Sequence, residues 1–286
     1  MLWAAAGSVL FSFMWVLPKT AGTDVSALQI GFLRYAAGAI CIAPFFFMGG
    51  QPASVDDCGR GHKSPRLLML HLLRAACGAL SLVLGAFAVT RMPLANVQAI
   101  AMTNGVYTVL FAALFLRERV GIREIIAGLV ALSGAVIVAG PGSTNAAGWA
   151  LLGVVAAFAQ AVAWGGEVVL LRATASRDRA SRMLFQVNIA AAAMILVAGV
   201  WFWESLSLQT FLLITAMGPI AIIGQLCNIR AFRLANATQL VPVRYSGIIF
   251  AAVFGFVFFD ERPDLSAIIG AAMIAFGAIW LAMKRT

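Results

Sequence analysis

Charged residues are scarce in this sequence, and their scarcity excludes a water-soluble globule. Only 11% of its 286 residues are Asp, Glu, Lys or Arg, whereas 62% are hydrophobic. A soluble domain carries about 25% charged residues to cover its surface. The polar side chains here are too few for that role, so lipid must be the main solvent of this chain.

Cysteine and the short signatures of enzymes are scarce or absent as well. The four cysteines, Cys41, Cys58, Cys77 and Cys227, have no metal-ligand or CxxC spacing, so we expect no metal site and no disulfide. The sequence contains no phosphate-binding loop, no HExxH and no nucleophile elbow. We therefore expect a protein that is not an enzyme, uses no cofactor and binds no nucleic acid.

Long apolar runs recur along the whole chain. Each is close to the roughly 20 residues that a helix needs to cross a hydrocarbon core of about 30 Å. The predicted spans are 2–18, 27–48, 66–89, 93–116, 121–140, 147–171, 181–203, 207–229, 238–259 and 265–283. They predict an all-α integral membrane protein with ten transmembrane helices.

Basic residues are distributed unevenly between the two sets of loops. With both termini in the cytoplasm, fourteen Lys and Arg lie in inside loops or the tail, and three, Lys19, Arg91 and Arg262, lie outside. This bias follows the positive-inside rule and explains the net charge of +9. It predicts a multi-pass protein of the cell inner membrane with both termini cytoplasmic.

The two halves of the chain resemble each other at an offset of 143 residues. Glu118 matches Glu261, Phe111 matches Phe254, and Gly134 matches Gly277. The offset spans five helices, an odd number, so the second half is predicted to be inverted in the membrane. Inverted repeats recur among transporters. We expect five-helix repeats at residues 1–142 and 143–286.

Several short stretches carry a resemblance to the drug/metabolite transporter (DMT) superfamily, and within it to ten-helix EamA-type members. The stretches are 32–35, 73–75, 93–95, 113–120 with Gly128 and Gly134, 230–232, 242–246 and 259–264. Residues 242–246 and 259–264 loosely resemble the subgroup that includes S-adenosylmethionine and riboflavin carriers. The first half departs from this pattern, because Ala99 stands where the second half has Pro242. The resemblance implies transport of a small molecule.

Polar and aromatic residues inside the spans are the candidates for a substrate pathway, because ionisable groups at that depth are costly and usually face a cavity. Structural roles, such as snorkelling arginines, a Glu167–Arg172 pair or hydrogen bonds between helices, remain open for them. The candidates are Trp15, Arg34, Arg74, Asn104, Tyr107, Gln160, Trp164, Glu167, Gln225, Arg244 and Tyr245. Arg74 is predicted near mid-bilayer and Glu167 within about 10 Å of the cytoplasmic face.

These observations predict a secondary transporter that works by alternating access. Three intramembrane arginines against one glutamate favour an amino-acid-like substrate or another metabolite with a carboxylate or phosphate. A drug or organic-cation exporter of the same superfamily is the alternative, followed by a membrane-embedded enzyme or a scaffold. Proton coupling, exchange for a counter-substrate, a monomer and a homodimer all stay open.

Overall fold

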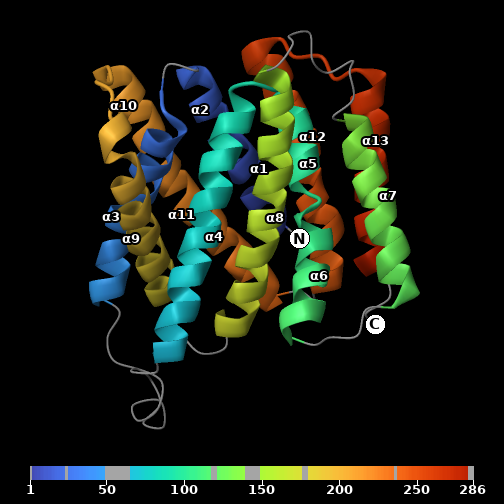
Figure 1. Ribbon diagram of the computed structural model, residues 1–286, viewed down its shortest axis with the longest axis horizontal. Coiled ribbons are helices and arrows are strands. Elements are labelled where there is room, and N and C mark those ends of the chain that lie inside the picture. The colour runs from blue at the N-terminus through green and yellow to red at the C-terminus, as the bar shows by residue number, and fades with distance from the viewer. Residues whose placement is uncertain are drawn as a thin grey trace.

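The computed structural model describes residues 2–22, 25–48, 65–116, 121–138, 149–175, 180–234 and 237–282, and their regular structure is helical (Figure 1). The helices are α1 Leu2–Met14, α2 Val16–Ala21, α3 Ala27–Met48, α4 Pro65–Val89, α5 Leu94–Ala101, α6 Asn104–Leu116, α7 Ile122–Val138, α8 Trp149–Ala175, α9 Ala180–Gly199, α10 Leu208–Thr215, α11 Met217–Leu234, α12 Ala237–Phe259 and α13 Leu265–Ala282. A 3-10 turn, Val200–Phe202, follows α9.

Three pairs of consecutive helices form single rods with a short break inside each. The breaks fall at Trp15 between α1 and α2, at Met102–Thr103 between α5 and α6, and at Ala216 between α10 and α11. The described helices thus form ten rods, as the sequence predicts. Seven rods are long and apolar enough to span a bilayer, and three contain shorter apolar helices. The all-α membrane architecture is therefore confirmed.

The helices pack in pairs that repeat between the two halves of the chain. The contact of α4 with α8 corresponds to that of α11 with α1. In the same way, the contacts of α8 with α5 and α6 correspond to that of α1 with α12. Helix α3 lies against α9 and α7 against α13. Every rod therefore has partners at equivalent positions in the other half.

Glycines bring α7 and α13 into backbone contact. A Cβ added to Gly134 would lie 2.7 Å from the carbonyl oxygen of Gly270, and one added to Gly277 would lie 2.7 Å from that of Ala127. Because these distances are too short for any side chain, only glycine allows this packing. The two contacts are equivalent at the offset of 143 residues.

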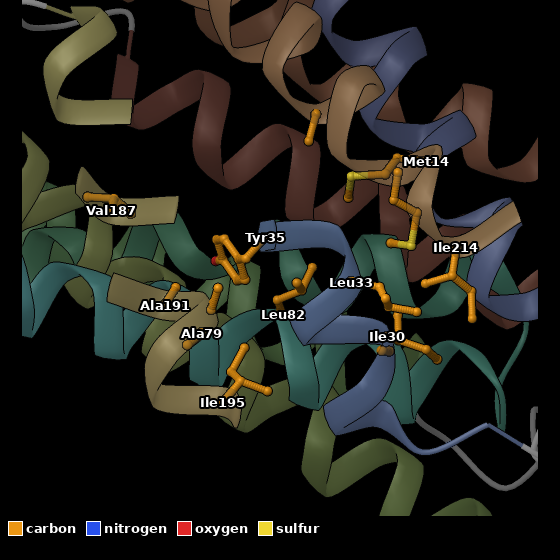
Figure 2. Close-up of a cluster of buried hydrophobic side chains, with 14 of the residues drawn as sticks. Met14, Ile30, Leu33, Tyr35, Ala79, Leu82, Val187, Ala191, Ile195 and Ile214 are labelled. Atoms are coloured by element: carbon orange, nitrogen blue, oxygen red, sulfur yellow. The ribbon is translucent and has the colours of Figure 1, made fainter. Parts of the chain in front are cut away.

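The buried apolar side chains form clusters of unequal size. The cluster in Figure 2 runs from Ile214 and Ile30, near the end of the bundle where α2 lies, to Tyr35 in the middle. A second large cluster includes Val16 and Leu94 at the same end. Many other large apolar side chains are exposed around the bundle, as expected for surfaces that face lipid rather than water.

Candidate functional site

The interface of α4 with α8 carries a pair of opposite charges at mid-bundle. Arg74 Nη2 lies 3.9 Å from Glu167 Oε1, and the two side chains are 4% and 20% exposed. The distance is within ion-pair range but too long for a hydrogen bond. Gly78, one turn after Arg74 on α4, faces the same carboxylate. A Cβ added to Gly78 would lie 3.3 Å from the carboxylate carbon of Glu167.

Helix α3 contributes two residues beside this pair. The Tyr35 hydroxyl would lie 3.1 Å from a Cβ at Gly78, so it reaches the same place as the Glu167 carboxylate. The Arg34 guanidinium lies over the Tyr35 ring, 4.1 Å from its centroid, and donates a 3.1 Å hydrogen bond to Asn188 Oδ1 on α9. We call Arg34, Tyr35, Arg74, Glu167 and Asn188 the charged cluster.

The charged cluster holds buried donors that no described residue satisfies. Nε and Nη1 of Arg74 and Nε of Arg34 are buried and have no hydrogen-bond partner among the described residues. Leaving such groups unpaired in a low-dielectric interior costs several kcal/mol, roughly, for a charged donor. Arg74 therefore offers two unsatisfied donors, on different edges of its guanidinium, to acceptors from outside the protein.

A second polar layer surrounds the break between α5 and α6. Side chains donate hydrogen bonds to the backbone carbonyls next to the break. Thr103 donates to Ile100 O at 2.7 Å, Asn104 donates to Ala101 O at 2.8 Å, and Tyr245 of α12 donates to Met102 O at 3.4 Å. Asn104 and Tyr245 thus stabilise the broken helix, which is a structural task for two of the predicted pathway residues.

Trp15 and Gln160 meet at the same depth on α4. A Cβ at Gly85 would lie 2.6 Å both from the Trp15 ring and from Gln160 Nε2, while Gln160 Oε1 is buried without a partner among the described residues. Gly85 is seven residues beyond Gly78, so this layer lies about 10 Å from the charged cluster. It sits on the side of the cluster that leads to α2.

The remaining predicted residues lie apart from the charged cluster or outside the description. The Cβ of Tyr107 contacts Gly165, and Trp164 packs against the second large apolar cluster. Gln225 is half-buried on α11, which packs mainly against α1 and α3. The Arg244 side chain lies outside the described residues, and its predicted role stays a prediction.

Glu167 lies two turns before the end of α8. The predicted span ended at residue 171, whereas α8 continues to Ala175. The extra turn moves Glu167 away from the helix end, and antiparallel packing sets it beside Gly78 in the middle of α4. Arg34 lies beside this place, because its guanidinium stacks on the ring of Tyr35, whose hydroxyl also faces Gly78.

Two members of the charged cluster were missed as site residues. Tyr35 directly follows Arg34, and Asn188 is a polar residue within an otherwise apolar span. The polar character of Asn188 was a usable signal, but its pairing with Arg34 depends on α3 crossing α9. For Tyr35 the sequence holds no signal beyond its neighbour, because a tyrosine in an apolar run is most often a packing residue.

A helical bundle with broken helices and a buried, charged interior defines a class, the polytopic membrane transport proteins. The sequence profile of the EamA-like transporter family matches residues 1–140 and again 151–283. The chain belongs to the EamA-like transporter family, a family of transporters and not of enzymes. The resemblance to the drug/metabolite transporter superfamily is thereby confirmed.

Characterised relatives agree with this family. The chain is 31% identical over its whole length to a pseudopaline exporter of Pseudomonas aeruginosa, covering 95% of that protein. It is 24% identical to a riboflavin transporter of Brucella anthropi (91% of this chain, 89% of that one), and 22% identical to an S-adenosylmethionine uptake transporter of Rickettsia bellii (91% and 84%). A solved crystal structure, 20% identical, matches 99% of this chain and 96% of its own with a TM-score of 0.66, which shows the fold.

Proposed function

We propose that this protein carries a small metabolite bearing a carboxylate or phosphate, amino-acid-like substrates included, across the inner membrane by alternating access. The observation that carries the proposal is Arg74, a buried guanidinium with two donors that no described residue satisfies. An unpaired arginine near mid-bilayer costs about 2.5–3.5 kcal/mol on translocon scales. A protein without a use for it would be more stable with leucine at this position.

The charged cluster supports a specific way of binding an anion. Glu167 is the ion-pair partner of Arg74, but at 3.9 Å it does not form a hydrogen bond. An anionic group on the substrate makes a shorter, charge-assisted hydrogen bond to Nε or to Nη1 of Arg74. Because two arginines face one glutamate, the empty cluster carries a net positive charge, and one substrate anion neutralises it.

We also propose that the two halves, residues 1–142 and 143–286, are inverted repeats that rock against each other. Equivalent positions in the two halves touch directly, since Tyr245 and Met102 stand exactly one 143-residue offset apart and share a hydrogen bond. The Gly134–Gly270 and Gly277–Ala127 contacts exchange with each other under the same offset. Contacts of this kind are expected next to a two-fold axis between inverted repeats.

The relatives support a metabolite over other cargo. Their names give pseudopaline, riboflavin and S-adenosylmethionine as cargo, in one case exported and in another taken up. A small organic molecule is therefore the expected substrate class here, and neither direction is favoured by them.

The test of the proposal is transport by Arg74 variants in liposomes. A panel of labelled amino acids, phosphorylated metabolites, riboflavin and S-adenosylmethionine first identifies a transported compound. Uptake per folded molecule should then fall in the order Arg74, Arg74→Lys, Arg74→Gln, because lysine keeps the charge but loses the planar guanidinium and glutamine loses both. We expect about a tenfold loss or more for Arg74→Gln, from one charge-assisted hydrogen bond or more.

Helix content and thermal stability of the variants provide the control. If Arg74 were only a tie between helices, folding and transport would be lost together, and full transport by Arg74→Gln would remove it from the substrate site. The alternative function, export of an organic cation, is favoured by the partly exposed Glu167 carboxylate. In that case Glu167→Gln abolishes transport of the identified compound, and that compound is a cation.

A further inference from the structure

One end of the bundle is tied by a network of charged and backbone groups that takes no part in the charged cluster. Lys19, at the end of α2, forms an ion pair with Glu261, which follows α12. The Lys19 ammonium also donates to Met92 O at 2.7 Å, and the other Glu261 oxygen accepts from the Leu94 backbone N–H, the first residue of α5, at 2.8 Å. We call Lys19, Glu261 and the backbone of Met92 and Leu94 the latch.

The latch is shielded, unlike the ion pair next to it. The Lys19 and Glu261 side chains are 13% and 19% exposed, and the ammonium lies over the Phe259 ring, 5.2 Å from its centroid. The neighbouring Asp260–Arg262 pair is 3.9 Å long with side chains 80% and 82% exposed. Exposed pairs contribute little because water and salt screen them, whereas the shielded, multiply bonded latch is well placed to hold two elements together.

The backbone around Glu261 is specifically shaped for this contact. Asp260 has φ 52°, a left-handed conformation that is uncommon for a residue with a side chain. The turn it makes lets the Glu261 N–H donate to Gly255 O at 3.1 Å and folds Glu261 back over the end of α12. Gly255 provides the room, because a Cβ there would lie 2.7 Å from Glu261 Oε2. This left-handed residue at the end of α12 is an αL cap of the helix, and the cap fixes the position from which Glu261 reaches Lys19 and Leu94.

The latch joins the two halves of the chain. Lys19, Met92 and Leu94 belong to the first half and Glu261 to the second, and all lie at the end of the bundle where α2 and the turn after α12 are seen in Figure 1. Directly beneath the latch, Val16, Ala88 and Leu94 are buried in the second large apolar cluster. The halves cannot separate at this end while these contacts persist.

We propose that Lys19 and Glu261 are the gate residues that hold this end of the transport pathway closed, and that breaking the latch opens it. The inference rests on the alternating access of the proposed function. Opening requires Glu261 to release both Lys19 and the α5 N-terminus, so the latch sets the population of the state open at this end. By the charge bias of the loops this is the outer end.

The experiment measures how fast a reporter thiol beneath the latch reacts. The four native cysteines are replaced by serine or alanine. The substitution Ala88→Cys then places the reporter thiol at a position that is fully buried in the structure. The reaction rate with a water-soluble methanethiosulfonate is followed in detergent-purified protein, so that neither orientation nor substrate is needed. The latch variants are Glu261→Gln, Lys19→Gln and Gly255→Ala, which displaces the Glu261 carboxylate without changing charge.

Each latch variant should raise the rate about tenfold, the effect of losing one charge-assisted hydrogen bond. Lys19→Arg keeps the charge and should leave the rate low, and so should the matched control Arg262→Gln, which removes only the exposed pair. Unchanged rates in the three folded latch variants, or an equal rise with Arg262→Gln, would overturn the gate. Helix content and the gel-filtration profile identify any misfolded variant. If Glu261→Gln does not fold, the rates of Gly255→Ala and Lys19→Gln decide the test. A negative result leaves the Arg74 proposal intact, because no substrate enters the assay.

Discussion

The latch end and the opposite end of the bundle are packed differently. At the latch end, two large buried clusters, which include Ile30 and Leu94, lie beneath an ion pair that is also bonded to backbone. Toward the other end, where α3 ends and α4 begins, the described residues form two small clusters, one of them around Ile42. Among the described residues, the latch end is therefore packed more extensively than the opposite end.

The largest expected effect contrasts one buried isoleucine at each end. Ile30→Ala removes a side chain from the large cluster of Figure 2 and should lower the free energy of unfolding by about 4 kcal/mol, because its neighbours are too tightly packed to close the cavity. Ile42→Ala lies in a small cluster and should cost about 2 kcal/mol. Thermal unfolding in detergent compares them. Equal losses would mean that the two ends are packed alike.

A smaller effect contrasts the layer below the latch with the charged cluster. Gly85→Ala drives a methyl group into Trp15 and Gln160 and should destabilise by about 1–3 kcal/mol, because the indole ring has little room to move. Gly78→Ala meets Tyr35 and Glu167 at 3.1–3.4 Å, so it should cost under about 1 kcal/mol while narrowing the proposed anion site. Melting curves and liposome uptake separate the two outcomes. The comparison fails if Gly78→Ala is the less stable variant.

The smallest effect concerns the contact between equivalent positions of the two halves. Tyr245→Phe removes the hydrogen bond to Met102 O and should cost about 0.6 kcal/mol, typical of such bonds in membrane interiors. Tyr107→Phe, the control on α6, should change thermal stability less. A loss of several kcal/mol in Tyr245→Phe would show that the helix break depends on this one hydroxyl far more than its 3.4 Å length indicates.

Most of the helical architecture was predictable because membrane helices follow apolar run length. The ten predicted spans correspond to the ten rods, and most boundaries agree within a few residues. Two of the three breaks have a local cause in the sequence, because Pro18 and Pro219 lack the N–H groups that would bond the carbonyls of Met14 and Thr215, the residues at which α1 and α10 end. The break at Met102–Thr103 has no proline at the corresponding place. Pro44 and Pro242, by contrast, lie inside the continuous helices α3 and α12.

The candidate site was predictable only in part. Depth in a span singled out Arg34, Arg74 and Glu167, which the structure brings close together from three helices. It also singled out Asn104 and Tyr245, which serve the helix break instead. Depth alone cannot separate these groups, because every polar residue at that depth needs a partner, and that partner can lie on the same rod, as for Asn104, or on another helix, as for Glu167.

The sequence by itself determined that this chain crosses a membrane many times, which residues lie within the spans, and that the halves share a pattern. Hydrophobic length and the cost of buried charge decide these properties locally. Only the tertiary structure decided that Glu261 closes on Lys19 and the start of α5, and that Arg74 keeps two donors unpaired. Both depend on which helix faces which, and that is set by glycine contacts between helices far apart in the sequence.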